Sequence, residues 1–138
     1  MFPTLAQGKL DTPIAPDTKT DWLTAQDIGR FAAEAFTYPE KFNHQELSLV
    51  GAKLTMAEVA AALSAVTGKH FEANSLTEED ALASGLFNWG IEPYVWQNVE
   101  GYKIDPRQAA GYGIQPESLE AFLERHKAFL QARYAGLA

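Results

Sequence analysis

The sequence of 138 residues contains no cysteine, no cluster of basic residues and no long hydrophobic run. Without cysteine the chain has no thiol nucleophile, disulfide or thiolate metal site, and it fits a reducing compartment. No segment approaches the roughly 18 apolar residues that a membrane span needs, and the N-terminal stretch lacks the basic start and apolar centre of a signal peptide. We therefore expect a cytoplasmic protein.

Positive charge is scarce, because 11 lysine and arginine residues stand against 18 aspartate and glutamate residues, for a net charge of −7. Such a chain repels the phosphates of nucleic acids and anionic membranes, so we expect neither as a partner. Apolar residues make up 46% of the chain and charged residues 21%, which is typical of a globular protein. This length predicts a single domain over residues 1–138.

The motifs of several enzyme classes are also missing. The chain has no GxGxxG or GxxGxxG dinucleotide loop, no GxxxxGK[ST] phosphate loop and no GxSxG elbow. Tyr38 and Lys41 are three residues apart, whereas the acid/base pair of short-chain dehydrogenases needs a spacing of four. No metal-ligand spacing relates the three histidines, His44, His70 and His126. The residues therefore predict no catalytic, cofactor-binding or metal-binding position.

The beginning of the chain predicts an arm followed by a helix. Residues 1–19 contain three prolines and a glycine, which predict an extended, turn-rich arm. Thr24 and Asp27 have the spacing of a helix N-cap, and apolar residues then recur at helical spacing until Pro39. We expect the first helix at residues 25–37.

The clearest helix signature follows residue 54. Thr55 and Glu58 form a capping box, Leu54 and Val59 form a hydrophobic staple, and Gly68 stands where a C-cap belongs. Thr77 and Asp80 have the same spacing of N-cap threonine and acidic residue, which predicts a shorter helix ending at Gly85. The buried stripe of the longer helix is expected to be Val59, Leu63 and Val66.

The remaining elements are less strongly patterned. Alternation predicts a strand at residues 46–50, and residues 69–76 predict a second. Some helix is expected after Pro93, and residues 115–136 predict one long amphipathic helix with Pro116 as its first residue. Its inner face would consist of Leu119, Phe122, Leu123, Phe129 and Leu130. The fold class predicted is α+β, mostly helical, with about five helices and a small sheet of two or three short strands.

One segment of the chain, residues 87–102, is rich in aromatic side chains. Such side chains could line an apolar pocket in which indole and phenol groups orient a ligand by hydrogen bonds. The alternative, and the favoured reading of these residues, is core packing or a contact between subunits. The candidate pocket residues are Phe87, Trp89, Tyr94, Trp96 and Tyr102.

Three segments of the sequence resemble the NmrA-like family, atypical relatives of the short-chain dehydrogenases. They are "DWLTAQDIGRFAAEAFTYPEKF", "ELSLVGAKLTMAEVAAALSAVTGK" and "EGYKIDPRQAAGYGIQPESLEAFLERHKAF". The family's motif W-[LV]-x-x-x-D-I-G-R begins a helix. It is matched by Trp22, Leu23, Asp27, Ile28, Gly29 and Arg30.

The resemblance implies a fold with a Rossmann domain that binds NADP or NAD, followed by a smaller substrate-side subdomain. Residues 20–138 resemble that subdomain, and the half that would carry the dinucleotide loop and the acid/base groups has no counterpart here. No cofactor-binding or catalytic residue is carried over, so no cofactor is expected for this chain alone. For Asp27 the resemblance implies only the role of a residue at the start of a helix.

A subdomain without its Rossmann partner would expose an apolar face, and such faces usually find a partner. The sequence therefore predicts self-association, in the form of a dimer that exchanges arms or helices. The candidate face comprises Phe2, Leu5 and Leu10 in the arm, with Phe31 and Phe36 in the first helix.

Three functions remain open from the sequence. The favoured one is a non-enzymatic domain that binds a small apolar molecule or another protein. The alternative is a fragment or split half of an NAD(P)-dependent oxidoreductase whose Rossmann half is absent. A third is a small stand-alone enzyme that uses Tyr94, Tyr102, Asp105 or a histidine.

Overall fold

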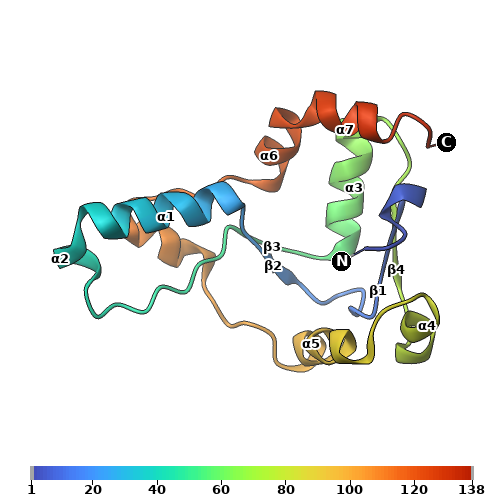
Figure 1. The fold of residues 1–138 in the computed structure, drawn as a ribbon, viewed down its shortest axis with the longest axis horizontal. Coiled ribbons are helices and arrows are strands. Elements are labelled where there is room, and N and C mark those ends of the chain that lie inside the picture. Colours follow the sequence, from blue (N-terminus) through green and yellow to red (C-terminus); the bar gives the residue numbers. More distant parts are fainter. Residues whose placement is uncertain (1, 138) are drawn as a thin grey trace.

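The computed structural model describes residues 2–137, apart from the side chains of residues 88 and 89. It confirms a mostly helical α+β fold (Figure 1). Instead of one small sheet, there are two separate sheets of two strands each. The elements in chain order are η1 (Leu5–Gln7), β1 (Lys9–Thr12), β2 (Thr20–Trp22), α1 (Ala25–Thr37), α2 (Pro39–Phe42), β3 (Ala52–Leu54), α3 (Met56–Thr67), β4 (Glu72–Ser75), α4 (Glu78–Ala83), α5 (Asn88–Val99), η2 (Pro106–Tyr112), α6 (Leu119–Arg125) and α7 (Lys127–Arg133).

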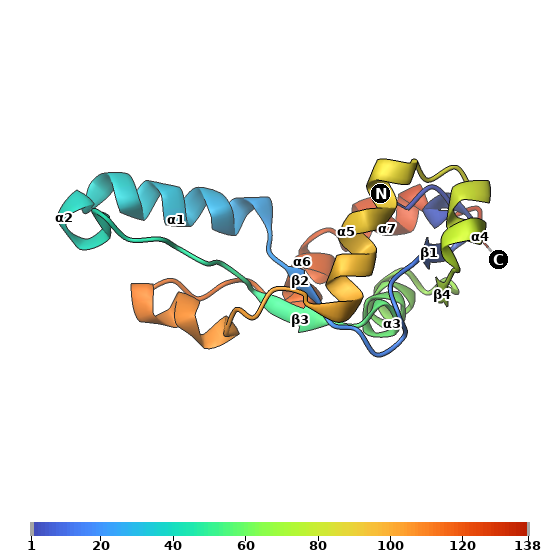
Figure 2. The same ribbon diagram turned by 90° about the horizontal axis from the view of Figure 1, so that it is seen from below.

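The elements divide into two groups along the long axis of the molecule. Helices α1 and α2 extend to one side together with η2, while α3, α6, α7 and the β1–β4 pair lie on the other (Figures 1 and 2). The extended part has a small core of Phe31, Ala109 and Ile114, against which Leu49 and Tyr112 pack. The main core lies between α3, β1 and α6, and its buried members are Leu10, Val59, Ala60, Leu63, Val66, Phe71 and Leu123.

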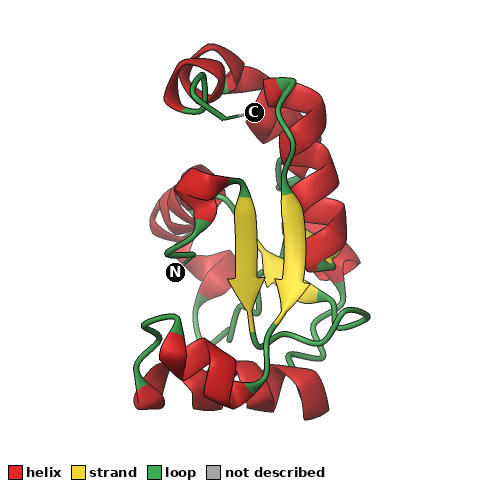
Figure 3. Cartoon of the chain, turned by 90° about the vertical axis from the view of Figure 1, so that its right-hand side faces the viewer, coloured by secondary structure: helices red, strands yellow, loops and turns green. Residues whose placement is uncertain are grey.

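The predicted arm is part of this core. Residues 9–12 form β1, which pairs in parallel with β4 in the register Leu10↔Ala73 (Figure 3). Leu10 is completely buried. Gly8 makes the turn into β1 with a φ of 79°, and a Cβ at this position would lie 2.7 Å from the backbone oxygen of His70. The arm therefore docks on the body of its own chain through strand pairing and through Leu10.

The predicted helix caps of α1 and α3 are confirmed. Thr24 accepts a hydrogen bond from the Asp27 N–H at 3.0 Å. Thr55 and Glu58 form the reciprocal capping box, and Gly68 ends α3 in the left-handed conformation. The backbone N–H of Thr55 donates to Glu58 and holds the pKa of that carboxyl below its ordinary value of 4.5. Local residue chemistry thus fixes where these helices begin.

The strand predicted at residues 46–50 is wrong, because this segment is irregular. The strand β3 lies just after it and pairs antiparallel with β2, from Leu54↔Thr20 to Ala52↔Trp22. Beyond Trp22 the chain turns into α1, so β2 offers no further partner to residues 46–50. Val50 is buried there without strand pairing.

The single C-terminal helix predicted from Pro116 is also wrong. Helix α6 begins at Leu119, because Ser118 accepts the Ala121 N–H and acts as its N-cap. His126 interrupts the helix with a φ of −101° and a ψ of 7°, and α7 follows. The break allows both α6 and α7 to pack on α3. Phe129, expected on the inner face, is exposed.

Helix α5 begins before Pro93, at Asn88, instead of after it. It is anchored by Asn98, whose side-chain amide donates to the Pro13 oxygen and accepts from the Ala15 N–H, both at 2.8 Å. Within the part of the chain that the structure describes, we find no helix with the length and apolarity of a membrane span.

Candidate functional site: an apolar groove with a polar end

A groove of about 440 Å³ opens between α3, α6 and the first strands. This volume lies within the range of roughly 300–1,000 Å³ that is usual for small-molecule sites. Its apolar lining consists of Phe2, Leu5, Leu10, Trp22, Leu23, Ala25, Ala52, Val59, Leu63, Leu119, Phe122 and Leu123. Its polar lining consists of Thr24, Glu117 and Ser118.

The apolar lining follows from how the main core is built. Val59 and Leu63 are four residues apart and therefore face the same side of α3, where they form part of the floor. Leu10 from β1 and Leu123 from α6 complete the buried floor. Side chains that are only partly buried, such as Trp22, form the walls. The groove is thus an opening in the main core, left between elements that are distant in the sequence.

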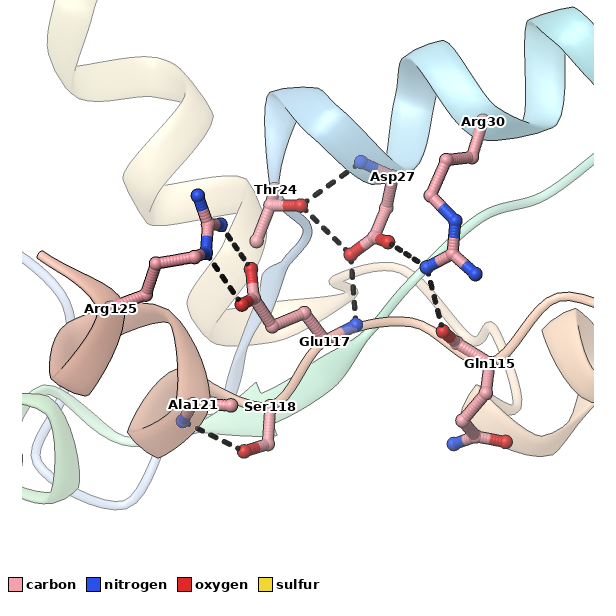
Figure 4. A network of polar contacts seen from close by, with 8 residues as sticks. All are labelled: Thr24, Asp27, Arg30, Gln115, Glu117, Ser118, Ala121 and Arg125. Atoms are coloured by element: carbon pink, nitrogen blue, oxygen red, sulfur yellow. Dashed lines mark hydrogen bonds and ion pairs between the residues drawn. The ribbon is translucent and has the colours of Figure 1, made fainter.

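The polar end of the groove is organised by Asp27, which does not line it (Figure 4). The Asp27 side chain is 2% exposed. Its Oδ2 accepts from the Thr24 hydroxyl at 2.8 Å and from the Glu117 backbone N–H at 2.9 Å. Arg30 donates to Asp27 Oδ1 at 3.1 Å and to the Gln115 backbone oxygen at 3.2 Å. The start of α1 is thereby fastened to the segment that leads into α6.

Glu117 is held from the other side by Arg125 (Figure 4). The guanidinium donates twice, from Nε to Oε1 at 3.0 Å and from Nη2 to Oε2 at 2.6 Å. These hydrogen bonds lower the pKa of the Glu117 carboxyl. Asp27 and Arg30 form one ion pair behind the polar end, and Glu117 and Arg125 form a second.

Ser118 has a different role at the polar end. Its Oγ accepts from the Ala121 N–H at 3.2 Å. Among the described residues no side chain or backbone oxygen takes the hydrogen of the Ser118 hydroxyl. The Glu117 oxygens each accept one bond from Arg125 and keep further lone pairs. Figure 4 shows the Glu117 carboxylate pointing toward Arg125 and the Ser118 hydroxyl pointing toward Ala121, on opposite sides of the segment.

The aromatic residues predicted to line a pocket lie elsewhere. Phe87 and Tyr102 are exposed, Tyr94 is partly exposed, and the Trp89 side chain lies outside the described residues. Trp96 contacts Tyr102 edge to face, with ring centroids 4.9 Å apart. Trp96 also lines a separate, shallow depression with Ile91, Val95, Glu78 and Glu92. The structure brings two of the predicted residues together, and none of the four whose side chains are described lines the apolar groove.

The residues predicted for an oligomer face are divided by the structure. Phe2, Leu5 and Leu10 line the groove. Leu10 and Phe31 are buried within the chain, so a partner could reach them only after a rearrangement. Phe36 is 86% exposed near the end of α1, together with the exposed Tyr38. Of the predicted set, Phe36 is the residue that projects freely into solvent.

Asp105, one of the residues considered for a stand-alone enzyme, has a structural role. Asp105 caps η2 and binds Arg107 through both carboxylate oxygens. The hydrogen bonds from Arg107 lower the pKa of Asp105 to about 2, which leaves it no role as a proton donor near neutral pH. Within the described residues there is no group of three or more histidine, aspartate or glutamate side chains arranged to hold a metal ion.

Sequence reasoning missed the groove because its lining residues come from five separate segments. The one local signal was the W-[LV]-x-x-x-D-I-G-R motif, which contains Trp22 in the groove wall and Asp27 behind its polar end. The family model of the NmrA-like family matches residues 2–106, and the chain belongs to this family. Residues 117–123, which form one side of the groove, lie beyond the match.

Proposed function

We propose that this chain binds a small, mainly apolar molecule in the groove and performs no chemistry of its own. The observation that carries the proposal is the groove itself, in which twelve apolar residues surround one compact polar end. Burying apolar ligand surface contributes about 25 cal/mol per Å². A few fixed polar groups then orient the ligand, as is usual in small-molecule sites.

The chemistry of the groove supports binding without catalysis. Of the described residues that line it, Glu117 is the only one with an ionisable side chain. Arg125 lowers the pKa of Glu117, so the carboxylate stays ionised and cannot donate a proton near neutral pH. A general acid or base needs a pKa near the working pH. We therefore assign Glu117 to ligand orientation.

The helix N-termini of this chain do not fit a dinucleotide. A pyrophosphate binds where a strand turns into a helix whose first N–H groups are free. Here the three turns from strand to helix carry a carboxylate at the third helical position, Asp27, Glu58 or Asp80. Each carboxylate already interacts with its threonine N-cap and would repel phosphate. We infer that NADP or NAD is not a ligand of this chain alone.

Fluorescence of Trp22, in the wall of the groove, provides a direct test. Titration with the uncharged probe phenylnaphthylamine should raise the emission of the probe and quench part of the tryptophan emission, to which Trp22 contributes beside Trp89 and Trp96. Leu119→Glu places a charge in the groove wall at the first residue of α6, where an acid is tolerated by the helix dipole. We expect it to abolish probe binding.

Leu82→Glu is the matched control, because Leu82 is exposed on α4 and lies outside the groove. It should bind the probe like the unaltered chain. Equal probe binding by both variants would place the apolar site elsewhere, and no binding by the unaltered chain would refute the proposal.

A second function is favoured by the β1–β4 sheet. Parallel sheets occur almost only with both faces covered and usually with more strands. Among the described residues, β1 and β4 pair only with each other, so their outer edges are open. This is what a half of an oxidoreductase that docks on a separate Rossmann sheet would present. Calorimetry of NADPH binding tests this second function. NADPH is titrated into this chain alone, into a dinucleotide-binding chain of the family alone, and into a mixture of the two.

We also propose that the chain self-associates. Phe36 and Tyr38 at the far end of α1 offer an exposed apolar contact. Light scattering should give the mass of a dimer for the unaltered chain and of a monomer for Phe36→Ser. A monomeric unaltered chain would contradict it.

A further inference from the structure

Helix α5 carries an apolar surface that packs against no other part of the chain. Val95, Trp96 and Val99 are exposed on this helix, and Tyr102 continues the surface by packing edge to face on Trp96. None of these four side chains, which together form the α5 face, lines the apolar groove. We propose that the α5 face binds a basic amphipathic helix of a partner protein.

The helical geometry of α5 makes the apolar residues neighbours. Val95 and Val99 are four positions apart, and Trp96 and Val99 are three apart, so the three side chains share one side of the helix. Valine is a poorer helix former than glutamate or lysine, so helix stability does not explain two valines at exposed positions. Contiguous exposed apolar side chains mark a contact with another molecule.

The α5 face is held in place by the rest of the chain. Ile91 is buried, and Asn98 ties α5 to the segment after β1 through hydrogen bonds with Pro13 and Ala15. Binding a partner therefore costs little ordering of the helix. Tryptophan and tyrosine contribute most often to the binding energy of protein interfaces, and the α5 face offers one of each.

Negative charge borders the α5 face. Glu92 of α5 and Glu78 of α4 line the same shallow depression as Val95 and Trp96. Among the described residues, neither carboxylate has a side-chain ion-pair or hydrogen-bond partner. The net charge of −7 on the whole chain adds to the negative potential at this depression. A partner that brings positive charge beside apolar side chains is the complement of this surface.

The same charges disfavour other occupants of the α5 face. A second copy in a symmetric dimer would bring its own Glu78 and Glu92 to the same surface, because such an interface uses the same patch of both chains. Nucleic acids and anionic membranes are repelled as well. An amphipathic helix can pack its apolar ridge along α5, while lysine or arginine beside that ridge reaches the carboxylates.

Three synthetic peptides with the same apolar side test the proposal. Two repeats of the heptad LKKLLKL place leucine on one side of a helix and lysine on the other. In the other two peptides, glutamine or glutamate replaces every lysine. Fluorescence anisotropy of the labelled peptides should show the lysine peptide binding about tenfold tighter than the glutamate peptide, with the glutamine peptide between them. Raising the salt concentration should weaken binding of the lysine peptide.

Substitution of an exposed apolar residue locates the contact on the chain. Val99 is 77% exposed, so Val99→Ser leaves the core intact and should weaken binding of the lysine peptide about tenfold. Phe129→Ser is the matched control, because Phe129 is also exposed but lies on α7, on the opposite side of the molecule from α5 (Figure 1). It should bind the peptide like the unaltered chain.

A second pair of variants tests the charge. Glu92→Gln removes one unpaired carboxylate and should weaken binding of the lysine peptide about threefold, with no effect on the glutamine peptide. Glu40→Gln removes the same charge from α2, at the far end of the molecule, and should leave both affinities unchanged (Figure 1). Circular dichroism verifies that all variants are folded.

Several results would overturn the proposal without bearing on the groove. Equal affinity for the three peptides, or no binding of the lysine peptide, would show that the α5 face does not select a basic helix. An equal effect of Val99→Ser and Phe129→Ser would place the peptide elsewhere. If light scattering gave a dimer for the unaltered chain and a monomer for Val99→Ser, a second copy would be the occupant of this face.

Discussion

Replacing Asp27 by alanine should destabilise the chain far more than its place in a helix cap suggests. The substitution removes two hydrogen bonds from neutral donors to a buried carboxylate, those of the Thr24 hydroxyl and the Glu117 N–H. Hydrogen bonds to charged groups are each worth roughly 1.5–3 kcal/mol. The ion pair with Arg30 adds little, because the Arg30 side chain is 50% exposed. We expect a loss of about 4 kcal/mol.

Asp80→Ala is the control for this prediction, because the two positions share the same local chemistry. Asp80 follows Thr77 with the same spacing, and the Thr77 hydroxyl donates to it at 2.7 Å. Asp80 is exposed and hydrogen-bonds to no distant segment among the described residues, so its loss should cost about 1 kcal/mol or less. The difference in the free energy of unfolding between the two variants isolates the contribution of the burial of Asp27 and of its hydrogen bond from the Glu117 N–H.

The assay is urea unfolding followed by far-UV circular dichroism, with the slope m compared between variants. Asp27→Asn should fall between the other two, near 1.5 kcal/mol, because its carbonyl oxygen can still accept from Thr24 and Glu117. Equal losses for Asp27→Ala and Asp80→Ala would refute the reasoning, since the burial and the reach of Asp27 to Glu117 would then contribute nothing.

Three further predictions use urea titrations. Gly68→Ala should cost about 1–2 kcal/mol because Gly68 has a positive φ. Gly8→Ala should cost more, because Gly8 also has a positive φ and a Cβ there would clash with backbone. Equal losses for the two variants would argue against the close approach at Gly8. Phe31→Ala should cost about 3–5 kcal/mol and Phe129→Ala less than about 0.5, because Phe31 is buried and Phe129 is exposed. Glu58→Gln should lose stability relative to the unaltered chain above pH 4.5, and this difference should shrink as pH falls below that value, because folding lowers the pKa of Glu58. A difference independent of pH would contradict the capping role of the carboxylate.

The Asp27 network gives the family motif a structural meaning in this chain. Asp27 and Arg30 both belong to W-[LV]-x-x-x-D-I-G-R, and their side chains reach residues 115–117 across about ninety positions of sequence. The motif therefore does more than start α1. It holds the segment before α6 in place, and that segment forms the polar end of the groove.

The sequence predicted best what depends on residues three or four positions apart. The caps at Thr24, Thr55 and Thr77 follow from short-range hydrogen bonds, so they could be read directly from the spacing of threonine and acid. The α+β class followed from the same helices together with the strand β4. Family membership followed from motifs that combine these local features, and the family match over residues 2–106 agrees.

Other elements depended on partners that spacing cannot reveal. Residues 46–50 alternate like a strand, but no neighbouring strand continues past Trp22 to pair with them. The C-terminal periodicity suited one helix, whereas packing of both α6 and α7 on α3 requires the break at His126. The arm contains a strand whose partner, β4, lies some sixty residues away in the chain.

Sequence alone accounts for the helix starts, the fold class, the family and the net acidity of this protein, because each depends on composition or on neighbouring residues. The position of the apolar site depends instead on tertiary packing. The aromatic cluster at residues 87–102 had the composition of a pocket, yet Phe87 and Tyr102 remain at the surface. The groove instead arises where β1, β2, α3 and α6 meet, because a cavity is defined by which distant side chains share a space, and sequence proximity does not record that.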